Sequence, residues 1–327
     1  MLISVLLFAV GLVLLIKGGD WFVDGATGIA KRFHLPDIVV GATVVSIGTT
    51  LPEVMVSTTG ALQGSGAMAY GNAIGSIICN TALIAAISIT CNPGPVNVKS
   101  MKTPVIFFFA SAALYCFASY VLGEFPRWMG FLMLGIFLCY TVLTVRSGLR
   151  SPDAAEEETE EAAERKLWQE LLLLIAGAAV IAVGADLLVD HGQIIAIELG
   201  VPKTVVALLF VALGTSLPEL ITTITSLKKG RAALGVGNVI GANVFNLVLV
   251  SGVAVSIAPF DVPMESVLRG TALNMSKVVD IPVMLSVMLL MTVPALLRKK
   301  LSRWQGIVLL CIYVAFCVCQ FTMAVPA

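Results

Sequence analysis

Two segments of the sequence place a proline and a glutamate inside strongly apolar surroundings. The hexapeptide GTTLPE occupies residues 48–53, and GTSLPE occupies residues 214–219. An ionisable side chain deep in an apolar span is costly and usually serves a function. Apart from Lys17, which is near a span end, no lysine or arginine lies in the middle of an apolar span. The expected counter-charge for Glu53 and Glu219 is therefore a bound cation or a proton.

The prolines and the neighbouring hydroxyl groups supply oxygen ligands. Pro52 has no N–H, so the carbonyl of Gly48 loses its helical partner, and such carbonyls are tolerated at membrane depth where they line a cavity or bind something. Carbonyl and carboxylate oxygens suit hard cations such as calcium and sodium. Hydroxyl residues recur at helical spacing around each glutamate: Ser46, Thr49, Thr50 and Ser57 in the first segment, and Thr215, Ser216 and Thr223 in the second. Each segment therefore has one oxygen-rich face.

Each hexapeptide is followed by a span in which asparagines recur. The first such span contains Asn72, Ser76 and Asn80 at intervals of four residues, and the second contains Asn238 and Asn246. A buried amide requires hydrogen-bond partners, and its oxygen can also bind a cation. These side chains extend the oxygen-rich region beyond the glutamates.

The two regions are copies of each other at a fixed offset of 166 residues. Between residues 45 and 80, fourteen of thirty-six positions are identical to the second copy without a gap, and Asp20 and Asp24 correspond to Asp186 and Asp190. The sequence therefore predicts a duplicated chain. The expected units are two ion-site repeats at 41–84 and 207–250, lying in halves at 1–148 and 169–327, with an acidic cytoplasmic linker at 149–168 that is typical of a solvated, partly helical tether.

The composition indicates an integral membrane protein. Apolar residues make up 58% of the chain and charged residues only 12%, against about 25% charged in soluble domains. Stretches long enough to cross a bilayer as helices lie at 2–22, 37–61, 67–91, 103–122, 127–146, 169–189, 203–227, 232–257, 279–297 and 303–324. Each half holds five spans, an odd number, so the second half must enter the membrane in the opposite sense. The prediction is an all-α polytopic membrane protein with ten transmembrane helices as two inverted five-helix repeats.

The basic residues predict how the chain is oriented. Fifteen lysines and arginines lie on one set of alternating loops and only four on the other, and loops rich in basic residues stay in the cytoplasm. Both termini are then extracytoplasmic. The short linker carries no regulatory domain, which favours a multi-pass protein of a prokaryotic plasma (inner) membrane.

With these motifs in view, the chain resembles the calcium/cation antiporter superfamily, in particular its prokaryotic sodium/calcium exchanger branch. The resemblance rests on GTTLPE followed by GNAIGSIICN, and on GTSLPE followed by GNVIGANVFN. It implies that Glu53 and Glu219 are the central ligands for calcium and sodium. It implies further metal ligands, through backbone carbonyls or side-chain oxygens, at Thr49, Thr50, Thr215, Ser216, Ser46, Ala212, Ser76, Asn80 and Asn246.

The resemblance also implies an activity: a secondary active cation antiporter that exchanges Ca2+ for Na+ by alternating access, with spans one and six sliding against the helices that hold the site. A Ca2+/H+ or K+-dependent antiporter of the same superfamily is the first alternative, and a cation channel is the second. The sequence lacks a Ser/His/Asp set, a histidine metal cluster and a nucleotide-binding loop, so an enzyme is not expected. The expected partners are Ca2+, Na+ and the lipid bilayer, with no cofactor, no nucleic acid and no required protein partner.

One departure from the family pattern concerns charge. Asn80 and Asn246 are both amides, whereas the family often has an aspartate at one of these positions. Two carboxylates balance one Ca2+ or two Na+. We therefore expect transport closer to electroneutral than in relatives that carry the additional aspartate.

Overall fold

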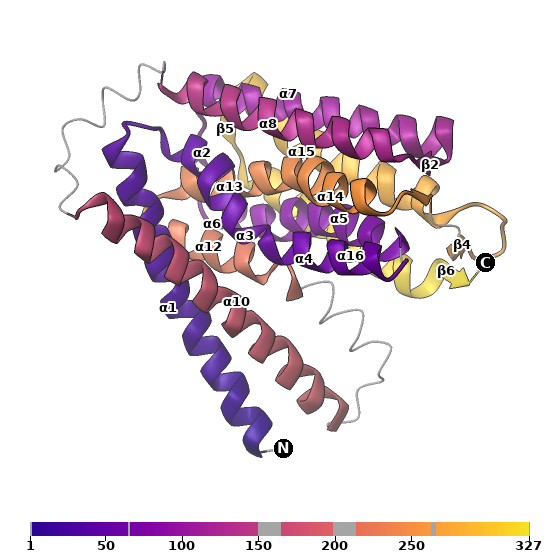
Figure 1. Ribbon diagram of the computed structural model, residues 1–327, viewed down its shortest axis with the longest axis horizontal. Helices are drawn as coiled ribbons and strands as arrows, with labels where there is room; N and C mark the ends of the chain where they lie inside the picture. The colour runs from indigo at the N-terminus through magenta and orange to yellow at the C-terminus, as the bar shows by residue number, and fades with distance from the viewer. Residues whose placement is uncertain (1, 65, 150–164, 199–213, 263–265, 327) are drawn as a thin grey trace.

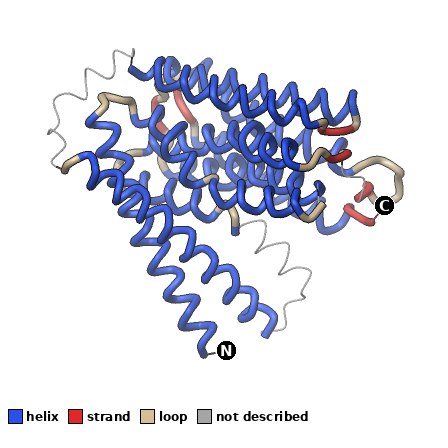
Figure 2. Tube along the Cα trace, in the orientation of Figure 1, coloured by secondary structure: helices blue, strands red, loops and turns tan. Residues whose placement is uncertain are grey.

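Helices make up almost all of the computed structural model, which describes residues 2–64, 66–149, 165–198, 214–262 and 266–326 (Figure 1, Figure 2). Within these ranges, eight uninterrupted helices are long and apolar enough to cross a membrane, and the bent pair Asp37–Thr49 and Leu51–Leu62 adds a ninth if it counts as one span. The helical membrane architecture is confirmed. The expected span 203–227 begins outside the described residues, so the number ten stays a prediction.

The first half consists of one long helix followed by helices that are interrupted by short π-helical segments, written η. Such segments often lie at functional positions. The elements are α1 (Leu2–Arg32), α2 (Asp37–Val40), η1 (Gly41–Val45), α3 (Ser46–Thr49), α4 (Leu51–Leu62), α5 (Gly66–Cys79), η2 (Asn80–Ala85), α6 (Ala86–Cys91), α7 (Val98–Cys116), η3 (Phe117–Leu122) and α8 (Arg127–Leu149).

The second half repeats the early part of this order. Its elements are α10 (Leu167–Glu198), α12 (Leu217–Lys228), α13 (Ala232–Phe245), η5 (Asn246–Val250), α14 (Ser251–Ile257), η6 (Ser276–Asp280), α15 (Ile281–Arg298) and α16 (Arg303–Met323). A shift of 166 residues brings both ends of α4 onto those of α12, and both ends of α5 onto those of α13. The same local sequence therefore produces the same breaks and the same helix lengths in both copies.

The helices that follow the two hexapeptides form the centre of the molecule. In the spans Met68–Cys91 and Ala232–Ile257, 72% and 78% of the most apolar window is buried, against 11% in Arg303–Met323. The asparagine-containing helices are therefore surrounded by protein, whereas the outer helices present apolar side chains to the lipid. This arrangement keeps the polar residues of the duplicated motif away from the hydrocarbon.

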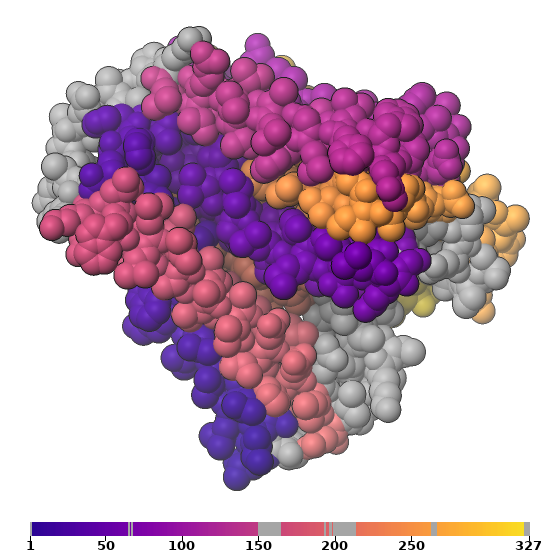
Figure 3. Space-filling model, viewed as in Figure 1, coloured from indigo at the N-terminus to yellow at the C-terminus, as the bar shows by residue number. Residues whose placement is uncertain are grey.

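Helices α1 and α10 lie side by side and extend away from the other helices, with the N-terminus at the tip (Figure 1, Figure 3). We call this pair the arm. The two helices run antiparallel and approach through glycines. A Cβ added at Gly11 would lie 2.9 Å from the carbonyl oxygen of Gly184, and one added at Gly18 would lie 3.0 Å from that of Gly177. Close approach of this kind requires residues without side chains.

In the part of the chain that the structure describes, three short antiparallel strand pairs are the exception to the helical architecture, and they were not predicted from the sequence. They are β1 (Gly94–Pro95) with β5 (Lys300–Leu301), β2 (Glu124–Phe125) with β3 (Phe260–Asp261), and β4 (Ser266–Leu268) with β6 (Ala324–Pro326). Two of the pairs join loops from different halves, so they fasten the first half to the second at the ends of the helices.

The arm helices are longer than the apolar spans predicted from the sequence. The first span was expected to end at residue 22, but α1 continues to Arg32 and carries Asp20 and Asp24 within the helix. The carboxylate of Asp24 lies 2.8 Å from Nζ of Lys229, and that of Asp20 lies 3.7 Å from it. Because a cation from another segment pairs with these acids, the helix continues past the point where an isolated apolar span would end.

Candidate functional site

Each hexapeptide contains a helix break. Thr50, between α3 and α4, has φ −85° and ψ −2°, and Ser216, before α12, has φ −89° and ψ 4°. The segments on either side of Thr50 meet at 45°. Pro52 and Pro218 lie in the first turn of the following helix, where the missing N–H costs no helical hydrogen bond. The prediction that proline interrupts the helix is borne out, and the interruption itself falls two residues before the proline.

The two glutamates occupy the same position in their helices. Glu53 and Glu219 are each the third residue of a helix, in the first turn of α4 and α12, and both are fully buried. The partial positive charge of a helix N-terminus favours a carboxylate there. None of the four carboxylate oxygens has a hydrogen-bond partner among the described residues, and no ion pair in the described chain includes either glutamate. Two buried carboxylates without a protein cation require a counter-charge of another kind.

The amides predicted as ligands lie where α-helix changes to π-helix. Asn80 begins η2, and Asn246 begins η5 at the equivalent position. Both amide groups are fully buried, and neither atom of the Asn80 amide has a described partner. Asn246 donates from Nδ2 to the carbonyl of Ala242 at 3.0 Å, which leaves its Oδ1 without a partner. Ser76 is also buried, one helical turn before Asn80.

The predicted hydroxyl residues fall into two groups. The hydroxyl of Ser216 is buried without a described partner. In contrast, the hydroxyl of Thr50 donates to the carbonyl of Ser46 at 2.6 Å, and the hydroxyl of Thr49 donates to Oδ1 of Asn238 at 3.1 Å. A hydroxyl that donates its proton in this way keeps lone pairs for another partner. The buried hydroxyl of Ser46 lies within donating distance of two carbonyls, that of Gly41 at 2.8 Å and that of Asn238 at 2.9 Å. The predicted position Ala212 lies outside the described residues.

Two asparagines of the oxygen-rich region that were not among the predicted ligands connect the parts of the site. Asn72 donates from Nδ2 to the carbonyl of Glu53 at 3.1 Å and to Oγ of Ser57 at 2.9 Å, and its Oδ1 accepts from the hydroxyl of Thr215 at 3.5 Å. Asn238 accepts from Thr49 in the corresponding way. Each asparagine therefore reaches a threonine of the other half. Their recurrence beside the glycines of both copies is the sequence signal that points to them.

The two hexapeptides meet at one groove. Thr49, Pro52 and Pro218 line a pocket of about 510 Å³ together with apolar side chains of α10 and α4. The structure thus brings together residues that are 166 positions apart in the chain. Because α10 forms the far wall, this groove also separates the arm from α4.

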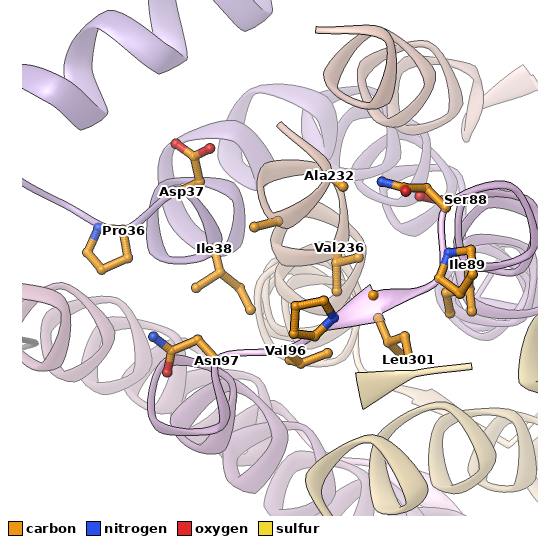
Figure 4. A pocket seen from close by; sticks show the side chains of 15 residues that line it. Pro36, Asp37, Ile38, Ser88, Ile89, Val96, Asn97, Ala232, Val236 and Leu301 are labelled. Carbon is orange, nitrogen blue, oxygen red and sulfur yellow. The ribbon is translucent and has the colours of Figure 1, made fainter. Parts of the chain in front are cut away.

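A second pocket, of about 370 Å³, lies at the end of the molecule where the loops carry basic residues. Figure 4 shows Asp37, Ser88 and Asn97 at its margins, around Val236 and other apolar side chains. The carboxylate of Asp37 is paired with Arg231 at 3.3 Å. None of the residues predicted for the site lines this pocket, so it is distinct from the glutamate region.

The two glutamate helices differ in how the arm covers them. Helix α1 packs along α12, and a Cβ added at Gly19 would lie 2.7 Å from Cγ2 of Ile221 and 2.9 Å from Oγ1 of Thr225. Lys229, which follows α12, forms the ion pairs with α1 described above. Helix α10 makes far less contact with α4, where Leu51 and Met55 are 51% and 70% exposed.

Comparison with known proteins gives matches over nearly the whole chain. The family model described as "Sodium/calcium exchanger protein" matches residues 3–146 and 170–322. An uncharacterized membrane protein of Methanocaldococcus jannaschii is 33% identical over 94% of this chain and 94% of its own length. Sodium/calcium exchanger MaX1 of Methanosarcina acetivorans is 28% identical over 98% of this chain and 99% of its own length.

The solved structures give a corresponding match for the fold. The sodium-calcium exchanger NCX_Mj, soaked with 2.5 mM Na+ and 10 mM Sr2+, superposes with a TM-score of 0.80 and 31% identity, covering 97% of this chain and 98% of that one. The same exchanger soaked without Na+ and Ca2+ gives a TM-score of 0.77 and 30% identity over 96% of this chain and 97% of that one.

Proposed function

Because the chain belongs to the sodium/calcium exchanger protein family, in agreement with the resemblance that its motifs carry, we propose that it exchanges Ca2+ for Na+ by alternating access. The observation that supports this most strongly is the pair of fully buried glutamates without a described protein cation. A membrane protein keeps two such carboxylates at its centre only where a mobile cation or a proton balances them.

The proposed ligand set surrounds the two helix breaks. Glu53 and Glu219 supply the charge, and the surrounding oxygens complete the coordination that hard cations prefer. The further ligands are Ser46, Thr49, Thr50, Ser76, Asn80, Ala212, Thr215, Ser216 and Asn246, with Ala212 acting through its carbonyl.

Shared ligands couple the two ions. Ca2+ and Na+ compete for the same carboxylates, so binding of one displaces the other. A site that crossed the membrane without a cation would carry two uncompensated carboxylates through a low-dielectric interior, which costs several kcal/mol. This penalty suppresses leak and enforces exchange.

The arrangement of the arm supports alternating access. If the basic loops are cytoplasmic, then α12 ends on the cytoplasmic side and α4 ends on the outer side. The arm covers α12 and leaves α4 largely free. We interpret this as the state that is closed towards the cytoplasm. Transfer of the arm from α12 to α4 would produce the opposite state.

Flux into proteoliposomes tests the function. We expect an outward Na+ gradient to drive uptake of radioactive Ca2+, whereas a pH gradient or a K+ gradient of the same size drives little. Uptake driven by pH alone would replace Na+ by H+ as the coupling ion, which the two buried carboxylates could also bind. Unitary currents in a planar bilayer would identify a channel and contradict the exchanger.

A further inference from the structure

We propose that Asn72 and Asn238 are positioning residues that act in alternation, each holding the glutamate helix that the arm does not cover. The proposal rests on the exchange function above, because it assigns the two asparagines to the two states of one transport cycle. Neither asparagine is among the proposed ligands.

The side-chain amide nitrogen of Asn72 is hydrogen-bonded to helix α4. Its amide nitrogen bridges the carbonyl of Glu53 and the hydroxyl of Ser57, at 3.1 and 2.9 Å. Both acceptors belong to the first two turns of α4. The amide therefore fixes the turn that carries the Glu53 carboxylate and determines where that carboxylate points.

Asn238 occupies the equivalent position and lacks the equivalent bonds. Its Oδ1 accepts from Thr49, but its Nδ2 is buried without a described partner. Thr223, which corresponds to Ser57 at the offset of 166 residues, also has a buried hydroxyl without a described partner. A donor and an acceptor are thus both present beside α12, but they are not joined. Leaving two buried polar groups unpaired is unfavourable, so an arrangement in which they pair would be stabilised relative to one in which they do not.

The arm contacts the glutamate helix whose asparagine lacks these bonds, and it leaves uncovered the glutamate helix whose asparagine forms them. Helix α12 is held by α1, through the close approach at Gly19 and the ion pairs of Lys229, and its asparagine is disengaged. Helix α4 has little cover, since a groove of about 510 Å³ separates it from α10, and its asparagine is engaged. Each glutamate helix is therefore held by one of two contacts: α12 is held by the arm, and α4 is held by its asparagine.

Because the two halves are repeats of each other, the two asparagines should exchange roles when the arm moves. When the arm moves onto α4, packing fixes that helix, and the Asn72 bonds are no longer required. The uncovered α12 is then fixed by Asn238 through the carbonyl of Glu219 and the hydroxyl of Thr223. The glutamate on the open side is in this way kept in a defined position for an arriving cation, although it lies on the less covered helix.

Ser57→Ala and Thr223→Ala form a matched pair of variants that tests the proposal. Each removes one acceptor and leaves every proposed ligand intact. The half-saturating Ca2+ concentration for exchange is measured in right-side-out and in inverted vesicles. We expect Ser57→Ala to raise it about fivefold at the outer face only and Thr223→Ala to raise it about fivefold at the cytoplasmic face only, the effect of losing one buried hydrogen bond. Thr58→Ala, at a neighbouring α4 hydroxyl without a described partner, is the control and should change neither value.

Two outcomes overturn the proposal: equal changes at both faces for each variant, which indicate a general structural role, or no change at either face. Asn72→Ala provides a second test if Ser57→Ala folds poorly, and it should also affect the outer face more. Calorimetric Ca2+ binding to the purified protein separates this result from the transport function. If Na+ drives no Ca2+ uptake but Ser57→Ala still weakens Ca2+ binding more than Thr223→Ala, the exchange function fails and the positioning role is retained.

Discussion

The two copies of the site motif are alike in sequence and backbone but differ in what holds them. Both break at the residue before the glutamate helix, and both place the carboxylate in the first turn. Yet α1 covers α12, while α10 leaves α4 largely uncovered. The repeat offers the arm an equivalent place against each glutamate helix. Because α1 and α10 are packed together as a single arm, they cannot cover α4 and α12 fully at the same time. Under the proposed alternating access, this asymmetry is the form expected of one of two states, and it does not require the halves to differ in function.

The strongest test of this equivalence removes the charge from one half at a time. Glu53→Gln and Glu219→Gln should each abolish Na+-driven Ca2+ uptake, a loss of at least about a hundredfold, because a single remaining carboxylate leaves one charge of the divalent cation unbalanced. Uptake of radioactive Ca2+ into vesicles measures the effect. Full activity in either variant would show that the two halves are not equivalent and would remove that glutamate from the proposed ligands.

A smaller effect is expected from blocking the cover on one side. Gly19→Val places its side chain against Oγ1 of Thr225, which would lie 2.9 Å from the added Cβ, and this contact remains when position 221 carries a reporter cysteine. Overpacking of about 1–3 kcal/mol should shift the population about tenfold towards the state in which α1 leaves α12. The readout is labelling of a cysteine at position 221 by a membrane-impermeant thiol reagent from the cytoplasmic side, in a background without the seven native cysteines. Faster labelling confirms the shift.

Ala182→Val on α10 is the matched control. Its side chain lines the groove beside α4, so the additional methyl groups enter open space. Because this groove closes when the arm moves onto α4, the variant should not accelerate labelling at position 221. Equal acceleration in both variants would show that the arm responds to bulk in general, not to the α1–α12 contact.

The ion pairs of Lys229 should contribute less than this packing. Lys229→Gln removes the pairs with Asp20 and Asp24, and because partly exposed pairs are weak, the same labelling rate should rise only about two- to fivefold. The repeat offers the reverse change. Gln63 corresponds to Lys229, and Asp186 and Asp190 correspond to its partners, so Gln63→Lys should favour the arm on α4 and slow labelling by a similar factor. Salt should accelerate labelling in the parent protein but not in Lys229→Gln, which lacks the pairs, and a parent protein insensitive to salt would contradict an electrostatic cause.

Membrane voltage should have the smallest effect on exchange. Because positions 80 and 246 carry amides, the charge of the site comes from two carboxylates, one in each half. One Ca2+ should therefore exchange for two Na+. The rate should then change by less than about twofold on imposing about −100 mV, whereas one net charge per cycle corresponds to about 2.3 kcal/mol at that voltage. Exchange measured in vesicles clamped with valinomycin and K+ provides the test, and a steep dependence would require a further charge at the site.

The sequence was sufficient to predict that each apolar segment breaks near its proline, whereas the depth of both glutamates in the membrane stays a prediction. Proline has a strong local effect, so its recurrence at 166 residues predicted a break in both copies, and the structure places the breaks two residues earlier, at Thr50 and Ser216. The family resemblance was also confirmed by the comparisons. The roles of Asn80 and Asn246 as ligands stay predictions, although both lie at the start of a π-helical segment.

The connections between distant segments could not be predicted in the same way. Asn72 was recognised as part of the repeat, but its bonds to Glu53 and Ser57 depend on the angle between α4 and α5, which no local pattern encodes. The length of α1 was underestimated because the partner of its acids, Lys229, is about two hundred residues away. If the protein alternates between two states as proposed, the choice of which glutamate helix is covered depends on the state, and a repeated sequence is compatible with both.

The glycines of the arm have a mechanical consequence. Gly11, Gly18 and Gly25 recur every seven residues along α1, or about 10.5 Å of helix, and each faces backbone atoms of α10. A slip of one or two residues would press side chains into those gaps, so the two helices keep a fixed register. We therefore expect the two helices of the arm to move together as one rigid body. Under the proposed alternating access, a displacement of the arm at one face of the membrane would therefore be transmitted to the other face, so that closing one side opens the other.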